Sequence, residues 1–90
     1  MLDVVASNRF RKDLKLAIKR GQDVQLLAAV VDRLAAQQPL EERYRDHELS
    51  GNYGGFRECH ISPDWLLIYK VKDNELILYL ARTGSHSDLF

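Results

Sequence analysis

Apolar residues in the first third of the chain recur three and four positions apart, the spacing of one helical face. A first helix is expected to start after Ser7 or Asn8, either of which can cap it, and to end at Gly21. A second is expected to start after Asp23 and to end before Pro39. The apolar positions of these helices are Phe10, Leu14, Ala17, Ile18, Val24, Leu27, Val31 and Leu34. The pattern predicts a helical hairpin with a very short connection, preceded by an edge strand over residues 2–6.

Beyond Pro39 the pattern changes from helical to extended. Residues 56–61, 65–71 and 75–81 are rich in aromatic and branched side chains, as is typical of strands, with turns at 62–64 and 73–74. The last two strands should pair antiparallel. Both faces of the middle strand are largely apolar, because Leu67, Tyr69 and Val71 alternate with Leu66, Ile68 and Lys70. Such a sheet needs cover, and the helical hairpin is the only predicted element that supplies it.

The expected fold class is therefore α+β. We expect a two-layer β-α-α-β-β-β arrangement, in which the N-terminal strand and the helical hairpin pack on a small antiparallel sheet. One further short strand is expected near residues 44–47. The 90 residues contain no repeat, low-complexity segment or linker, which predicts a single domain over residues 1–90. A chain of this size has room for one core.

Composition indicates the cellular setting. The single cysteine, Cys59, cannot form an internal disulfide, and no basic stretch followed by an apolar run opens the sequence as a secretory signal would. The longest apolar runs, residues 26–31 and 65–69, are far shorter than the roughly 20 residues that a membrane-spanning helix needs. We therefore expect a cytoplasmic protein in a reducing compartment, with no membrane partner.

Charge is zero overall but unevenly distributed. A net charge of zero argues by itself against a nucleic-acid binder, because cationic side chains supply most non-specific affinity for phosphates. Residues 1–21, however, hold six basic and two acidic side chains, a balance of +4, whereas residues 22–50 hold three basic and six acidic ones. The basic stretch is either the solvated face of a helix or a phosphate-binding face that includes Lys12, Lys15 and Lys19.

The chemistry-bearing residues lie in the second half. His47, His60 and His86 each fall near a predicted strand end or in a terminal segment, where side chains can converge on one edge of a sheet. Histidine both takes and gives a proton near neutral pH. Asp64 follows His60 across a turn and can orient an imidazole or act as a base. Arg82 suits a phosphate that gains negative charge. These residue types together fit RNA cleavage.

The same residues also have other interpretations. Trp65 and Phe90 are stacking platforms for bases, or Trp65 is a core residue. Arg82 either binds a phosphate or pairs with a surface carboxylate. Asp64 is either a functional group or an ordinary turn residue. The histidines and Asp64 also make a possible metal-ligand set, but they lack the short paired spacing of zinc sites. Cys59 is a possible nucleophile, but it alternates with His60 along a strand and so faces the other way. We expect no metal, no cofactor and an inert Cys59.

Several motifs in order resemble the YafQ branch of the RelE/ParE superfamily of toxins. They are FRKDLKLAIKRG in the first helix, DHEL followed by a glycine, GFRECHISPDWLLIY, and ARTGSHSDLF at the end. The resemblance covers essentially the whole chain. It implies the RelE-like fold and a ribosome-dependent endoribonuclease that cleaves messenger RNA without a metal, through attack of the ribose 2′-hydroxyl on phosphorus. It also implies a cognate antitoxin as partner, and the ribosomal A site as the place of action.

The resemblance also assigns roles to individual residues. His60 and Asp64 would lie near the 2′-hydroxyl, one of them acting as base, and His86 would protonate the departing 5′-oxygen. Arg82 would hold the scissile phosphate, and His47 would bind a neighbouring phosphate or tune the other groups. Trp65 would support the site, Phe90 would meet a base, and the basic first helix would contact ribosomal RNA.

Two competing functions belong to other classes. The same superfamily fold hosts ParE-like toxins that inhibit DNA gyrase, and fold alone does not fix function. A gyrase inhibitor has no need of His60, Asp64 and His86 together, so this histidine set favours the nuclease. A non-catalytic binding module remains the alternative if those side chains do not converge.

Overall fold

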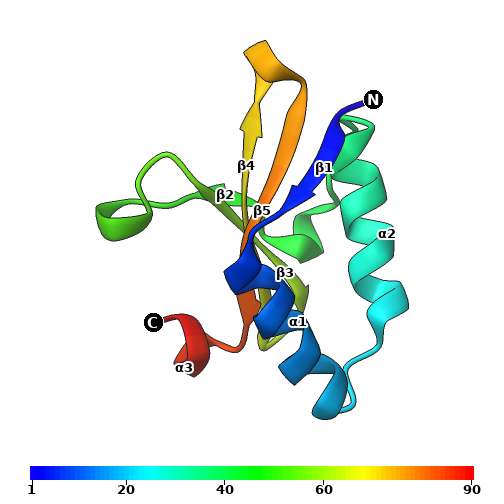
Figure 1. Ribbon diagram of the computed structural model, residues 1–90, viewed down its shortest axis with the longest axis vertical. Helices are drawn as coiled ribbons and strands as arrows, with labels where there is room; N and C mark the ends of the chain where they lie inside the picture. Colours follow the sequence, from blue (N-terminus) through cyan, green and yellow to red (C-terminus); the bar gives the residue numbers. More distant parts are fainter.

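The computed structural model describes all 90 residues. The helices and strands follow one another as β1 (Asp3–Ala6), α1 (Asn8–Lys19), α2 (Val24–Ala35), β2 (His47–Glu48), β3 (Arg57–Ser62), β4 (Trp65–Lys72), β5 (Ile77–Gly84) and α3 (His86–Leu89) (Figure 1). Short 3₁₀ helices span Glu42–Tyr44, Gly51–Tyr53 and Asp73–Glu75. None of the helices is long and apolar enough to cross a membrane.

The predicted helical hairpin is confirmed, including its capping residues. The Ser7 side chain accepts a hydrogen bond from the Phe10 amide at 2.9 Å, and the Asp23 carboxylate accepts one from the Gln25 amide at 2.9 Å. These bonds satisfy amides that would otherwise lack a partner at each helix start. Gly21 has a φ of +83°, so it turns the chain between the helices in a conformation that glycine adopts without strain.

The five strands form one mixed sheet in the order β1-β5-β4-β3-β2. β1 lies at one edge, as predicted, and pairs parallel with β5, while the other pairs are antiparallel. The short strand expected near residues 44–47 lies at His47–Glu48 instead, because residues 42–44 form a 3₁₀ turn and Arg45 adopts a left-handed φ of 48°. β5 extends beyond the predicted end to Gly84, which pairs with Leu66.

The main core fills the space between the sheet and the helical hairpin. Its largest fully buried residues are Trp65, Leu67 and Tyr69 of β4 and Leu78 of β5, which lie against Phe10, Leu27 and Val30 of the helices. The predicted alternation along β4 is confirmed, because Leu66 and Ile68 belong to a separate cluster on the opposite face.

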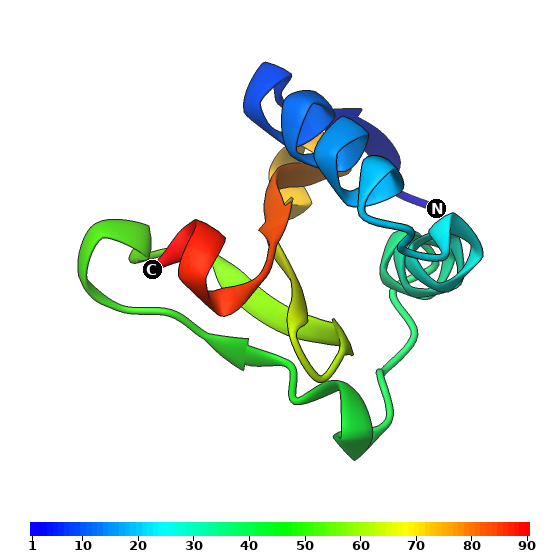
Figure 2. The ribbon, with the colours of Figure 1, turned by 90° about the horizontal axis from the view of Figure 1, so that it is seen from below.

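The expectation that only the hairpin covers the sheet was wrong. Leu66 and Ile68 are fully buried beneath Leu89 of α3, with Leu49, Tyr53, Phe56 and Ala81 around them. Figure 2 shows α3 and the loop before β3 on one side of the sheet and the helical hairpin on the other. Four residues are too few for helix α3 to show a periodic pattern. Its sequence signal is the capping box of Ser85 and Asp88, which the structure contains.

Candidate active site

The three histidines converge with two carboxylates on the face of the sheet that α3 covers. The His60 and His86 rings lie 5.5 Å apart between centroids. Nε2 of His47 and Nε2 of His60 lie 3.6 and 3.7 Å from the same oxygen, Oε1 of Glu58. Nδ1 of His86 lies 2.7 Å from Oδ1 of Asp64. We call His47, Glu58, His60, Asp64 and His86 the histidine cluster; it joins residues from β2, β3, the β3–β4 turn and α3.

Asp64 contacts His86 rather than His60. Oδ1 of Asp64 accepts hydrogen bonds from the backbone amide of His86 at 2.9 Å and from the imidazole Nδ1 at 2.7 Å. The backbone bond, followed by the side-chain bond, lowers the pKa of Asp64 below its ordinary value. Because an ionised carboxylate only accepts hydrogen bonds, Nδ1 of His86 carries the hydrogen. Nε2 is then the ring nitrogen left for a substrate.

Glu58 was missed by the sequence reasoning. Its side chain is 6% exposed, and only its Oε1 lies near partners, since the buried Oε2 has no hydrogen-bond partner. The distances to His47 and His60 exceed that of a direct hydrogen bond but are within the range of an ion pair. Oε1 therefore forms an ion pair with either ring only when that ring is protonated. The signal in the sequence was its position two residues before His60, on the same face of β3.

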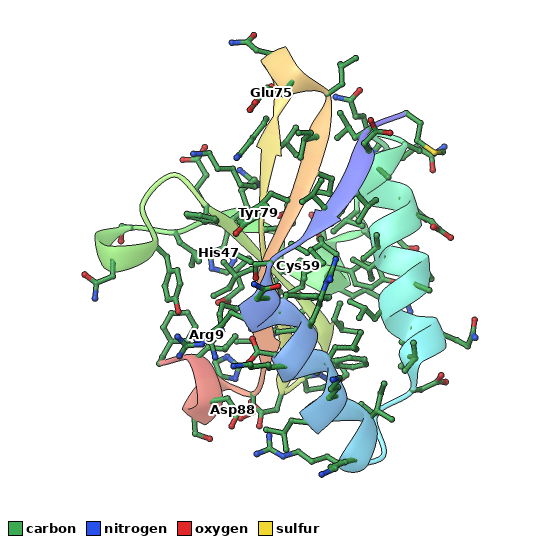
Figure 3. The ribbon with its side chains drawn as sticks, in the orientation of Figure 1. Arg9, His47, Cys59, Glu75, Tyr79 and Asp88 are labelled. Carbon is green, nitrogen blue, oxygen red and sulfur yellow. The ribbon has the colours of Figure 1, made fainter.

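A half-buried network holds the segment that carries His47. Asp46 accepts hydrogen bonds from the Tyr69 hydroxyl at 2.5 Å and from Nε of Arg57 at 3.2 Å. Burial is the main cause that raises the pKa of Tyr69, so its hydroxyl stays a donor at neutral pH. The next residue, His47, places Nδ1 2.6 Å from the Arg45 carbonyl oxygen, which can only accept a hydrogen. Figure 3 shows His47 on the side of the strands away from α2.

Arg82 lies on the same face as the cluster but is paired with a carboxylate. The register places Glu58, Ile68 and Arg82 in one row across β3, β4 and β5. The guanidinium donates from Nε and Nη2 to the two oxygens of Asp13 on α1, at 2.7 and 3.1 Å. These bonds are the first cause that raises the pKa of Arg82. Arg82 therefore makes a specific pair with Asp13, and no contact joins it to the histidines in this structure.

The two aromatic candidates occupy different environments. Trp65 is 1% exposed in the main core, and its indole N–H donates to the Thr83 hydroxyl at 2.8 Å. It has no free face on which a base could stack. Phe90 is 64% exposed and packs edge-on against Tyr53, with 5.8 Å between ring centroids. Of the two, only Phe90 presents a surface to a nucleotide.

The remaining candidates lie outside the cluster. Lys12, Lys15 and Lys19 are exposed on α1 and make no ion pair. Cys59 is fully buried on the opposite face of β3 from His60, and burial raises the pKa of its thiol to about 12. A thiol of that kind is not a nucleophile at neutral pH. No group of three or more histidine, cysteine, aspartate or glutamate side chains is arranged to hold a metal ion.

Comparisons with known proteins show the family to which the chain belongs. Residues 2–90 match the family described as a bacterial toxin of the type II toxin-antitoxin system, YafQ. The chain is 42% identical over 89 residues to the mRNA interferase toxin YafQ of Escherichia coli strain K12, covering 98% of this chain and 95% of that protein.

Solved structures give the same result. A metal-bound toxin from Helicobacter pylori is 51% identical, with a TM-score of 0.94 and full coverage of both chains. YafQ from the E. coli DinJ-YafQ complex is 41% identical, with a TM-score of 0.89, and the match covers 100% of this chain and 99% of that one. The α+β fold that the sequence predicted is thereby confirmed as that of YafQ toxins. The chain belongs to the YafQ family of bacterial type II toxin-antitoxin toxins, whose E. coli K12 member is named an mRNA interferase.

Proposed function

We propose that this chain is a ribosome-dependent mRNA interferase, an endoribonuclease that cleaves messenger RNA and is neutralised by a cognate antitoxin. The observation that carries the proposal is the histidine cluster, in which three imidazoles and two carboxylates from distant parts of the chain meet on one sheet face. Membership of a family with named mRNA interferases, and the DinJ complex of a relative, support the substrate and the antitoxin.

The proposed reaction is attack of a ribose 2′-oxygen on the adjacent phosphorus. The 2′-hydroxyl gives its proton to a base as the new P–O bond forms, and the bond from phosphorus to the 5′-oxygen breaks. The departing 5′-oxygen takes a proton from an acid, which leaves a 2′,3′-cyclic phosphate and a 5′-hydroxyl. DNA lacks the 2′-hydroxyl and is not a substrate. We assign both proton transfers to side chains of this protein.

His86 is the proposed acid and His60 the proposed base. Asp64 holds Nδ1 of His86 at 2.7 Å, so Nε2 of the protonated ring is the nitrogen that donates to the 5′-oxygen. Because Asp64 is already engaged by His86, His60 is the better candidate for the base. Glu58 stabilises the charge that His60 gains with the proton, since its carboxylate lies 3.7 Å away.

The other candidates have supporting roles in this proposal. Both nitrogens of His47 lie near protein groups, namely the Arg45 carbonyl and Glu58. This favours an electrostatic effect of His47 on the other cluster residues over direct phosphate binding. Arg82, fixed by Asp13, holds the scissile phosphate with the nitrogen that Asp13 leaves free. Phe90 packs on a base, and Trp65 supports β4 beneath the site.

Primer extension on messenger RNA tests the proposal directly. Purified parent chain and His86→Ala are incubated with a defined message, free or on programmed ribosomes. We expect cleavage by the parent on ribosomes and a loss of about 10² to 10⁴ in rate for His86→Ala. Ser87→Ala, one exposed position further along α3, is the matched control and should cleave like the parent. A parent that leaves messages intact but blocks supercoiling by DNA gyrase would instead be a gyrase inhibitor.

Exposed lysines on α1 are the proposed contacts to ribosomal RNA. They are Lys12, Lys15 and Lys19. Replacing all three by glutamine should weaken binding to ribosomes and reduce its salt dependence, since each lost phosphate contact lowers the slope of log K against log salt by about 0.7 to 0.9. Sedimentation with ribosomes over a salt series measures this. An unchanged slope would show that the lysines are only a solvated helix face.

A further inference from the structure

A cleft of about 590 Å³ opens beside the histidine cluster. His60 and His86 form one part of its lining, and Leu26 of α2 and Pro63 form apolar parts. Ile61 and Ser62 of β3 also line it, and a further wall comes from the segment just before β2, namely Arg43, Tyr44 and Arg45. The volume lies within the range of about 300 to 1,000 Å³ that is usual for small-molecule sites.

The charge of this cleft is unbalanced. Its lining includes two arginines and two histidines but no carboxylate. Arg45 makes no ion pair, and Arg43 approaches only Glu41, at 3.5 Å between two largely exposed side chains. Solvent screens such a contact strongly. In the neighbouring pocket around Arg82, by contrast, Arg82 and Arg20 are each paired with an aspartate at 2.7 Å or less. An anion is therefore the chemical complement of the larger cleft and not of the smaller one.

The cleft also offers a stacking surface. The Arg43 guanidinium lies 4.8 Å from the centroid of the Tyr44 ring and donates to the Tyr44 hydroxyl at 2.9 Å. Tyr44 is half-buried against the main core, so the exposed surface of this pair is the guanidinium plane of Arg43, of the kind on which bases stack. Leu26, 48% exposed, supplies apolar surface on another side.

We propose that this cleft binds the nucleotide next to the scissile phosphate, with Arg45 and Arg43 contacting its phosphate and the Arg43–Tyr44 pair contacting its base. The proposal rests on the proposed function, because it takes the histidine cluster as the place where RNA is cut. His60 and His86 both line the cleft, so an RNA strand whose scissile phosphate contacts them lies at the edge of the cleft. The next nucleotide of the strand then lies along the cleft wall. An acidic protein segment would match the charge of the cleft equally well, but it would not need to contact His60 and His86.

Cleavage of a short message, free and on programmed ribosomes, tests the cleft. Maximal rate and half-saturating toxin concentration are measured for the parent, Arg45→Ala, Arg43→Ala and the double variant. Each single change should raise the half-saturating concentration about 3- to 10-fold, which is the effect of losing one hydrogen-bonded contact. The maximal rate should fall by a smaller factor. The salt slope should fall by about 0.7 for each phosphate contact removed. The control is Lys72→Ala, which removes one cation at the far end of β4.

The outcomes separate the cleft from the reaction. If both arginine variants saturate like the parent and cleavage is intact, the cleft does not bind RNA and the proposed function stands. If the variants cut RNA normally but bind the antitoxin weakly, the cleft is a protein-docking surface and the inference is overturned. If the parent cuts no RNA under either condition, the proposed function itself fails, and the inference fails with it.

Discussion

Replacing Thr83 by valine tests whether a buried hydrogen-bond relay through Trp65 stabilises the fold beneath the site. Thr83 is 1% exposed. Its hydroxyl accepts from the Trp65 indole N–H at 2.8 Å and donates to the Leu66 carbonyl at 2.6 Å. Valine has nearly the same shape as threonine, so the change removes the hydroxyl while leaving little or no cavity. The indole N–H then has no partner inside the core, and the carbonyl loses one.

The expected cost follows from the two groups that lose a partner. A buried donor or acceptor without a hydrogen bond costs about 1 to 3 kcal/mol. The carbonyl belongs to the β4 backbone and keeps a second lone pair, so its share lies at the lower end. We therefore expect Thr83→Val to lower the free energy of unfolding by about 2 to 4 kcal/mol, a large part of the roughly 5 to 15 kcal/mol of a small domain.

A double-mutant cycle isolates the relay from packing. Trp65→Phe removes the indole N–H together with some volume. In the Thr83→Val background it should cost about 1 to 2 kcal/mol less than alone, because no unpaired indole remains to be removed. Urea unfolding followed by circular dichroism measures all four proteins in a His86→Ala background, chosen because loss of the proposed acid is expected to reduce toxicity during expression. A cost under about 0.5 kcal/mol for Thr83→Val at an unchanged m-value, or an additive cycle, would refute the relay.

Three further predictions concern aspartates that pair with a histidine or an arginine. Asp64→Asn should slow RNA cleavage about 10- to 100-fold, less than loss of a fully buried orienting carboxylate, because Asp64 and His86 are half exposed. Asp73→Asn in the β4–β5 turn serves as control, and a cleavage rate equal to that of the parent would contradict the role of Asp64. Asp13→Ala should destabilise the fold by about 2 to 3 kcal/mol in urea, because it strands the guanidinium of Arg82, whose side chain is 16% exposed. A loss below 1 kcal/mol in the free energy of unfolding would show that water solvates the unpaired guanidinium of Arg82 in the variant. The Arg20 hydrogen bond, ahead of the Ser85 amide, lowers the pKa of Asp88 to about 2. Since a lowered carboxyl pKa stabilises the fold above the ordinary value of 3.8, the stability lost in Asp88→Asn should be constant from pH 7 to about pH 4 and should shrink between pH 4 and 2. A difference that already shrinks above pH 5 would exclude Asp88 as its source.

The sequence by itself determined the local structure of this protein. Ser7, Gly21 and Asp23 fixed the ends of the helical hairpin, because capping bonds join residues only two or three positions apart. Alternation along β3 and β4 determined that Cys59 and His60 face opposite ways, since successive side chains of a strand point to opposite faces. Neither conclusion needed a contact between distant residues.

Only the tertiary structure decided which functional groups meet. The sequence indicated that the histidines converge, but not that Glu58 lies between His47 and His60, or that Asp64 pairs with a histidine 22 positions later. The pairing of Asp13 with Arg82 spans 69 positions. These contacts depend on the strand order and on the docking of α3 over Leu66 and Ile68. Strand order and helix docking are set by the packing of the whole chain, which no short pattern of residues encodes.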